Sequence, residues 1–145
     1  MKLSTRTRYG MRALLELAIA YKMGPLQIKV IAERQNISNK YLEQLVAMLK
    51  TAGLVRSIRG PHGGYVLTRS PEETKLSDIF QTLEGTVLTV ECVGNENICS
   101  GHADCVTRKL WVQMNDAILS VLENKTLQSL VEMADKEKTN MNYQI

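Results

Sequence analysis

The spacing of hydrophobic residues predicts three helices in the first fifty residues of the chain. The first covers about Tyr9–Met23, and Gly24-Pro25 behind it is a stop signal, because glycine suits a helix C-cap and proline cannot continue the helix. The second covers about Ile28–Gln35. The third extends from the N-cap Ser38 to about Lys50 and carries hydrophobic residues at i, i+3, i+4 and i+7, the pattern of a helix packed on a core.

A β-hairpin follows the third helix. Val55–Ile58 and Tyr65–Leu67 are short β-prone runs, and the segment Gly60–Gly64 between them is rich in glycine. Hydrophobic positions from Leu76 to Leu83 mark a further short helix that Gly85 ends. Three helices followed by a two-stranded hairpin is the element order of a winged helix-turn-helix. We therefore predict a mainly α fold with a small β-hairpin, with a winged helix-turn-helix DNA-binding domain over residues 1–85.

The second half of the chain divides into a loop, two helices and a tail. Residues 86–106 begin with a β-prone stretch, Thr86–Val90, continue as an irregular polar loop and hold every cysteine. A long helix, about Thr107–Leu122, and a short helix capped by Thr126 occupy residues 107–134, and the polar residues 135–145 are expected to be disordered. The long helix has an apolar stripe with no obvious surface to cover, which predicts a homodimer. The alternative is that it packs on the first helix of its own chain.

The charge of the chain is distributed unevenly. The net charge of +3 combines +8 over residues 1–75 with −5 over residues 76–145. A basic half joined to an acidic half indicates a polyanion partner for the first half, and double-stranded DNA fits the predicted fold. The alternative is an uneven surface without a polyanion partner.

Composition and hydropathy are those of a soluble globular chain. Hydrophobic residues make up 44% and charged residues 23% of the 145 positions. No stretch reaches the roughly 20 apolar residues of a membrane helix. Arg12 and Glu16 interrupt the apolar stretch Met11–Ala20, which argues against a signal peptide. We therefore expect a cytoplasmic protein without a membrane partner.

Two segments carry residue types suited to DNA. The exposed face of the third helix is polar near its N-terminal end, where lysine and glutamine can bond base edges and hydroxyl groups can bond phosphate. The hairpin tip combines arginine with glycines that permit a close approach, and an arginine there can enter a narrow minor groove. The alternatives are a solvated helix face and a plain turn. The candidate DNA-binding residues are Ser38, Asn39, Lys40, Tyr41, Glu43, Gln44, Arg56, Arg59, Gly60 and Pro61.

Three cysteines fall within 14 residues and indicate metal or redox chemistry. Cys92, Cys99 and Cys105 have the spacing C-x6-C-x5-C. Three clustered cysteines do not make a disulfide framework, and thiolates suit iron–sulfur clusters or zinc. The alternative is that the cysteines are incidental or structural. An enzyme is the least favoured class, because only His62 and His102 are histidines and neither forms a nucleophile–base arrangement with a cysteine by spacing.

The chain resembles the winged-helix regulator family of the iron–sulfur cluster regulator IscR, with its NsrR and CymR relatives. The resemblance extends from Lys2 to about residue 133. It implies a DNA-binding dimer whose third helix reads the major groove and whose Arg-Gly-Pro wing enters the minor groove, which gives these roles to Tyr41, Glu43, Gln44, Arg59 and Pro61. The segments that carry the resemblance are Ile31–Ser38, Tyr41–Leu45, Val55–Pro61 and Gly63–Tyr65.

The same resemblance implies an iron–sulfur cluster on the three cysteines, with 2Fe–2S favoured and 4Fe–4S as the alternative. Family members complete the site with a histidine three residues after the third cysteine or with an N-terminal aspartate of the partner subunit. Here Arg108 and Arg8 stand at those places, and neither can be a ligand. His102 is the preferred fourth ligand. The other candidates are Asp104, Glu91, Glu96, a small thiol or water.

The leading functional hypothesis is a transcription regulator, either a repressor or a dual regulator, that senses cluster status through the cysteine loop. A second hypothesis keeps the DNA binding without the cluster, so that the regulator of cysteine or sulfur metabolism answers to a protein partner or to thiol oxidation. A third is a winged-helix protein-interaction module that binds no nucleic acid. Steep salt dependence of duplex binding would separate the first two from the third.

Overall fold

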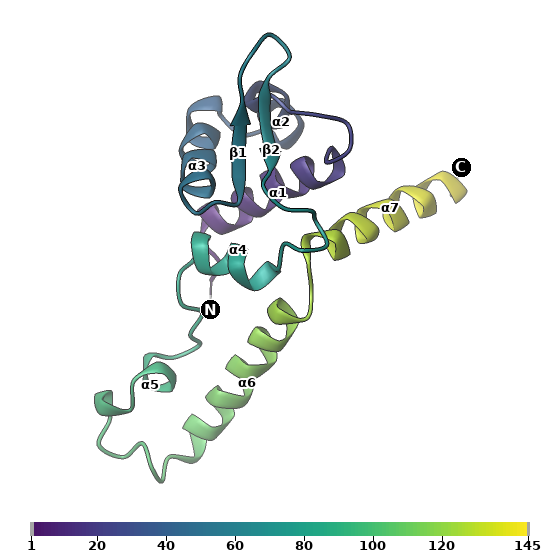
Figure 1. The fold of residues 1–145 in the computed structure, drawn as a ribbon. Coiled ribbons are helices and arrows are strands. Elements are labelled where there is room, and N and C mark those ends of the chain that lie inside the picture. The colour runs from purple at the N-terminus through teal and green to yellow at the C-terminus, as the bar shows by residue number, and fades with distance from the viewer. Residues whose placement is uncertain (1, 145) are drawn as a thin grey trace.

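The computed structural model describes residues 2–144 and confirms a mainly helical fold with a two-stranded antiparallel hairpin. A body of helices and the hairpin lies at one end, and two long helices extend from it (Figure 1). The elements are α1 (Thr5–Ile19), α2 (Ile28–Gln35), α3 (Asn39–Thr51), β1 (Val55–Ile58), β2 (Gly64–Leu67), α4 (Leu76–Leu83), α5 (Glu91–Gly94), the 3-10 helix η1 (Glu96–Ile98), α6 (Val106–Glu123) and α7 (Leu127–Tyr143).

Helix α1 begins and ends four residues earlier than the hydrophobic spacing predicts. Its N-cap is Ser4, whose hydroxyl accepts a hydrogen bond from the Thr7 N–H at 3.1 Å. The α-helix ends at Ile19, and residues 20–23 continue as turns up to Gly24, whose φ of 98° suits glycine. The apolar period therefore extends past the regular helix.

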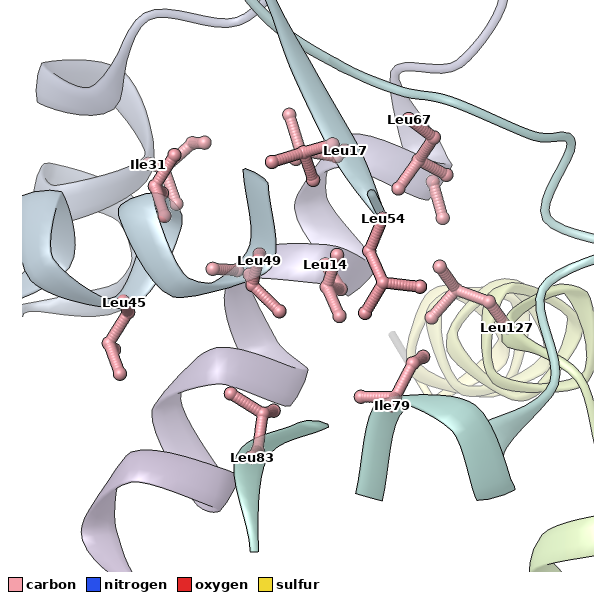
Figure 2. Packing of buried hydrophobic residues seen from close by; sticks show 14 of the residues in the cluster. Leu14, Leu17, Ile31, Leu45, Leu49, Leu54, Leu67, Ile79, Leu83 and Leu127 are labelled. Carbon is pink, nitrogen blue, oxygen red and sulfur yellow. The ribbon is translucent and has the colours of Figure 1, made fainter. Parts of the chain in front are cut away.

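The hydrophobic core lies where α1, α3, α4 and the hairpin meet. Leu14, Leu49 and Ile79 have no exposed surface, and Leu127 at the start of α7 is equally buried. Figure 2 shows these side chains converging from four different helices. Each buried leucine or isoleucine stabilises the fold by about 1.5–3 kcal/mol relative to leaving it exposed. The core thus joins the first turn of α7 to the body that positions α3 and the hairpin.

The hairpin is held in register by Val55 opposite Leu67 and Ile58 opposite Gly64. An isolated bridge between Leu26 and Tyr65 ties β2 to the segment before α2. The loop closes with a hydrogen bond from the Gly63 N–H to the Gly60 carbonyl at 3.0 Å. A Cβ atom at position 63 would lie 2.1 Å from the carbonyl oxygen of Ile58. Glycine at 63 is therefore required by the close approach of backbone to backbone.

Replacing Gly63 with alanine is expected to destabilise the chain by about 1–3 kcal/mol, the usual cost of forcing an atom into filled space. The obstructing atom is backbone, so no side-chain rotation relieves the contact. Thermal unfolding followed by circular dichroism measures the effect. Gly101→Ala is the matched control, because a Cβ there meets nothing within 4 Å. Equal melting temperatures of the two variants would contradict the assignment.

The N-terminus of α1 is fastened to the end of α4 by Glu84. Its carboxylate accepts hydrogen bonds from the Ser4 hydroxyl at 2.7 Å, from the Ser4 N–H at 3.2 Å and from the hydroxyl of the buried Thr7. The Thr7 and Ser4 hydroxyl groups hold the pKa of Glu84 below its ordinary value of 4.5. The pair of helices is therefore joined by an ionised carboxylate.

Acidification is expected to weaken the contact that Glu84 makes between α4 and the start of α1. Since the folded-state pKa of Glu84 lies below the unfolded value, its contribution to stability is complete above pH 4.5 and is lost as the pH falls through the folded pKa. Glu84→Gln should lower the melting temperature at pH 7 and flatten its decline between pH 5 and acid pH. Glu33→Gln, at an exposed position of α2, is the control. An unchanged acid limb in Glu84→Gln would refute the coupling.

Two segments of the second half differ from the sequence expectations. Residues 86–90 form no strand. Thr89 instead donates its N–H to the buried Asn115 side chain at 3.1 Å and its hydroxyl to the Trp111 carbonyl at 3.2 Å. A β-prone segment therefore lies on α6, because hydrogen-bond partners there replace those of a neighbouring strand.

The expected disordered tail is the other difference, because α7 continues as a helix to Tyr143. A capping box between Thr126 and Ser129 starts this helix. Neither glycine nor proline interrupts it, and Glu132 and Lys136 have the i, i+4 spacing that favours a helix. Polarity at the end of the chain is thus compatible with a solvated helix.

No helix within residues 2–144 is both long enough and apolar enough to cross a membrane.

Candidate DNA-binding surface and cysteine loop

The N-terminal end of α3 presents a polar surface to solvent. Ser38 caps the helix by accepting a hydrogen bond from the Tyr41 N–H at 3.2 Å, which leaves its own O–H free to donate. The apolar stripe of α3 is buried, and the opposite face is exposed. The candidate residues on that exposed face are Asn39, Lys40, Glu43 and Gln44.

Tyr41 is placed differently from the other candidates. It is only half-exposed, because its ring meets the Tyr9 ring edge-on with 6.1 Å between the ring centroids. Arg12 in turn lies over the Tyr9 ring, 5.3 Å from its centroid. The prediction that Tyr41 is exposed like its polar neighbours on α3 was wrong, since helical spacing from the apolar stripe does not reveal a contact with α1. Its ring therefore packs against α1, and part of the residue remains exposed.

The hairpin tip projects beyond the body (Figure 1). Arg59, Gly60 and Pro61 are exposed there, whereas Arg56 is exposed near the start of β1, away from the tip. Gly60 has a φ of 120°, a conformation that glycine adopts at no steric cost. The tip therefore offers a cationic side chain and a narrow backbone on the same protruding loop.

Helix α6 leaves an apolar stripe uncovered. Val106, Leu110, Met114 and Val121 are 75%, 50%, 45% and 54% exposed, and they follow one another at helical spacing on one face. Only Asn115 and Leu122 of this helix are buried. The intrachain alternative for α6 is not what the structure shows, because it is α7 that packs on α1 while α6 meets α4 and α5. An exposed apolar stripe of this length is typical of a protein contact.

The cysteine loop is formed by α5, η1 and the turns before α6. Cys99 is exposed, and Cys92 and Cys105 are half-exposed. The Cys105 thiol lies 3.2 Å from the Thr107 hydroxyl. This hydroxyl group and the backbone N–H of Arg108 lower the pKa of Cys105 below its ordinary value. These contacts make deprotonation of Cys105 easier than that of a free thiol, and the thiolate is the form that binds metals and reacts with oxidants.

Arg108 joins two parts of the cysteine loop through hydrogen bonds. Its Nε donates to the Cys92 carbonyl at 3.1 Å, and its Nη2 donates to the Glu96 carboxylate at 3.2 Å. The same carboxylate lies 3.8 Å from His102 Nε2, and His102 Nδ1 is 3.3 Å from the Cys99 carbonyl. Sequence reasoning treated Arg108 only as a failed ligand and missed this role. The signal that could have found it is the pairing of an arginine with acidic residues on the preceding loop.

The donor set fits three positions of an iron–sulfur site. Three free thiols stand on one loop, and none is buried in the core. Across residues 2–144, however, no three His, Cys, Asp or Glu side chains lie close enough together to hold a metal ion. The fourth position is also not supplied as expected, because His102 faces Glu96 and Arg108 is a cation. A cluster on this loop therefore requires the thiols to converge and a fourth ligand from elsewhere.

Comparisons with known proteins agree with the winged-helix fold. The Rrf2 family profile, described as an iron-dependent transcriptional regulator, matches residues 3–133. The HTH-type transcriptional regulator CymR of Bacillus subtilis is 42% identical over 138 residues, which cover 95% of each chain. The solved structure of CymR, the global cysteine regulator of B. subtilis, has a TM-score of 0.80 at 41% identity and covers 92% of this chain and 98% of its own.

A second solved structure, IscR of T. potens, has a TM-score of 0.77 at 38% identity and covers 94% of this chain and 90% of its own. These relatives are regulators and not enzymes. Both the element order and the near-complete coverage therefore place the chain in one family. Because the profile spans residues 3–133 and full-length relatives exceed 30% identity, the chain belongs to the Rrf2 family of winged-helix transcriptional regulators.

Proposed function

We propose that this regulator binds operator DNA as a homodimer and represses transcription according to the state of its cysteine loop. The observation that carries the proposal is the joint exposure of the polar face of α3 and the arginine-bearing hairpin tip on one basic half of the chain. An α-helix fits the major groove, and a protruding arginine fits a narrow minor groove. Ser38, Asn39 and Lys40 would position the helix, while Glu43 and Gln44 would read bases.

The homodimer would form through the exposed stripe of α6. Covering four partly exposed apolar side chains on each subunit provides a continuous contact, and twofold symmetry presents two copies of α3 to two half-sites. One half-site contact would bind more weakly than two joined contacts, so the dimer contact would be part of the DNA-binding mechanism. The stripe begins at Val106, directly after Cys105, so the loop and the dimer contact share one helix end.

The loop would act as the sensor through Cys92, Cys99 and Cys105. These thiols would hold an iron–sulfur cluster, with 2Fe–2S favoured, and a small thiol, water or a reoriented His102 would complete the ligand set. When bound, the cluster supplies a redox-active group that oxidants can remove. The ion pair between Arg108 and Glu96 would hold the loop against α6. Because Cys105 is the N-cap of α6, a change at its thiol would reach the start of this helix.

The cluster assignment is tested by anaerobic purification. Visible absorption, iron and acid-labile sulfide are measured per chain, before and after reconstitution. Equal amounts of iron and sulfide, lost in Cys99→Ala, would support the cluster. The number of iron atoms per chain, together with the visible spectrum, would separate 2Fe–2S from 4Fe–4S. Colourless protein that takes up neither would overturn it.

A second candidate function is favoured by the hydrogen bonds from Arg108 to the Cys92 carbonyl and the Glu96 carboxylate, which join parts of the loop through protein groups. In it the loop stays cluster-free, and oxidation of Cys105 or a protein partner supplies the signal. The lowered pKa of the Cys105 thiol supports oxidation as the signal. The iron and sulfide measurements decide between the two candidates.

Arg59→Ala is expected to weaken operator binding about tenfold and to reduce the salt slope by about one unit, because one phosphate or groove contact is lost. Fluorescence anisotropy with labelled duplex at several salt concentrations measures both. Arg69→Ala is the control, since Arg69 is exposed outside the hairpin tip. Unchanged affinity of Arg59→Ala would refute the role of the wing.

A further inference from the structure

A hollow away from both proposed sites lies between the C-terminal end of α1, the turn at residues 70–73 and the first turn of α7. Its volume of about 360 Å³ falls in the range of roughly 300–1,000 Å³ that is typical of small-molecule pockets. The lining includes the apolar side chains of Ala18, Ile19 and Pro71, of which Ala18 and Pro71 are buried. The hollow thus has an apolar floor that a small organic group can cover.

Polar side chains of opposite charge surround this floor. Lys22 and Glu72 both line the hollow, together with Tyr21 and Gln128. Neither Lys22 nor Glu72 takes part in any ion pair formed within residues 2–144. The side-chain hydrogen bonds of the neighbouring turn involve other residues, such as Ser70 with Glu73 at 3.0 Å. An ammonium and a carboxylate are therefore both available to a ligand in the same hollow.

We propose that this hollow binds a free amino acid. A zwitterion carries a carboxylate and an ammonium on one carbon, so it can meet the Lys22 ammonium and the Glu72 carboxylate with two charge-assisted hydrogen bonds. Its side chain would lie against the apolar part of the lining, formed by Ala18, Ile19 and Pro71. A simple anion or a simple cation would leave one of the two protein charges unused and in contact with the wrong sign.

The position of the hollow gives such binding a regulatory consequence. The joint beside it is made by the Gln128 N–H donating to the Pro71 carbonyl at 3.0 Å and the Leu127 N–H donating to the Thr74 carbonyl at 2.8 Å. Glu72 lies on the turn after β2 and Gln128 lies on the first turn of α7. A ligand that contacts both residues therefore touches both segments that these hydrogen bonds join. If the bound amino acid favours one arrangement of the joint, it changes the affinity of the chain for DNA. Bound DNA then changes the affinity of the chain for the amino acid by the same factor. This consequence rests on the proposed function, whereas the binding itself does not.

The test is titration calorimetry of the full chain with each of the twenty free L-amino acids. We expect saturable binding of at least one of them and none of its N-acetylated amide, which lacks both charges. Lys22→Met and Glu72→Gln should each weaken that binding at least tenfold. The matched controls Lys136→Met and Glu132→Gln, at exposed positions of α7, should leave it unchanged. Circular dichroism establishes that each variant is folded.

Three results would overturn the proposal: no binding by any free amino acid, equal binding of the free and capped forms, or unchanged binding in both pocket variants. Duplex binding measured without amino acid tests the proposed function separately. A chain that binds amino acids and not DNA would therefore refute the regulator's proposed mechanism alone. A chain that binds DNA and no amino acid would refute only the proposed amino-acid site.

Discussion

The double variant Leu110→Gln/Met114→Gln is expected to be monomeric and to bind operator DNA at least about 100-fold more weakly than the wild-type chain, because joining two half-site contacts contributes roughly 10²–10⁴ to avidity. The two residues are 50% and 45% exposed in the single chain and lie on the apolar stripe of α6. In a dimer they would be covered, so each glutamine would bring an amide into an apolar contact. Sedimentation velocity and duplex anisotropy on the same samples measure both effects.

The matched control for the dimer prediction is Lys109→Gln/Asp116→Gln on the same helix. Both positions are exposed and polar and lie off the apolar stripe, and the double change leaves the net charge unaltered. This control should remain dimeric. The proposed dimer contact would be wrong if Leu110→Gln/Met114→Gln stayed dimeric, or if it became monomeric and retained full operator affinity. Unchanged melting of the helical body would show that only assembly was affected.

Gln44→Ala is expected to weaken binding to the operator about 10- to 100-fold and to relax the preference at one base pair, since a bidentate contact to a base is worth roughly 1–3 kcal/mol of discrimination. Gln44 is exposed on the polar face of α3, one turn after the N-terminal end. Its amide can both donate and accept, which suits the edge of adenine. Competition binding with operators substituted at single positions measures the preference.

Gln81→Ala is the matched control for the base-reading prediction, because Gln81 is exposed on α4 and lies outside the proposed DNA surface. It should bind the operator as the wild-type chain does. Gln44→Ala should retain its salt slope, because no phosphate contact is removed. A uniform loss across all substituted operators, with a smaller salt slope, would assign Gln44 to the phosphate backbone and contradict base reading.

Local signals in the sequence determined most of the winged-helix body. α2 spans Ile28–Gln35 and β1 spans Val55–Ile58, as the hydrophobic spacing and the β-prone run predict. Ser38 caps α3 because a hydroxyl before a helical run accepts a backbone N–H. These features depend on residues close to one another in the chain, so periodicity and capping rules suffice. The spacing of the three cysteines was equally visible in the sequence alone.

Contacts between distant segments decided the remaining features. The Tyr9 ring partly covers Tyr41, and Thr89 bonds Asn115 on α6 instead of joining a strand. Arg108 donates a hydrogen bond to the Cys92 carbonyl and so stabilises the loop, although the ligand spacing indicated only that Arg108 is not a metal ligand. Lys22 and Glu72 likewise line one hollow, although they come from the turn after α1 and the turn after β2. Pattern rules report which face of an element is buried, whereas the partner on that face is set by the packing of the whole chain.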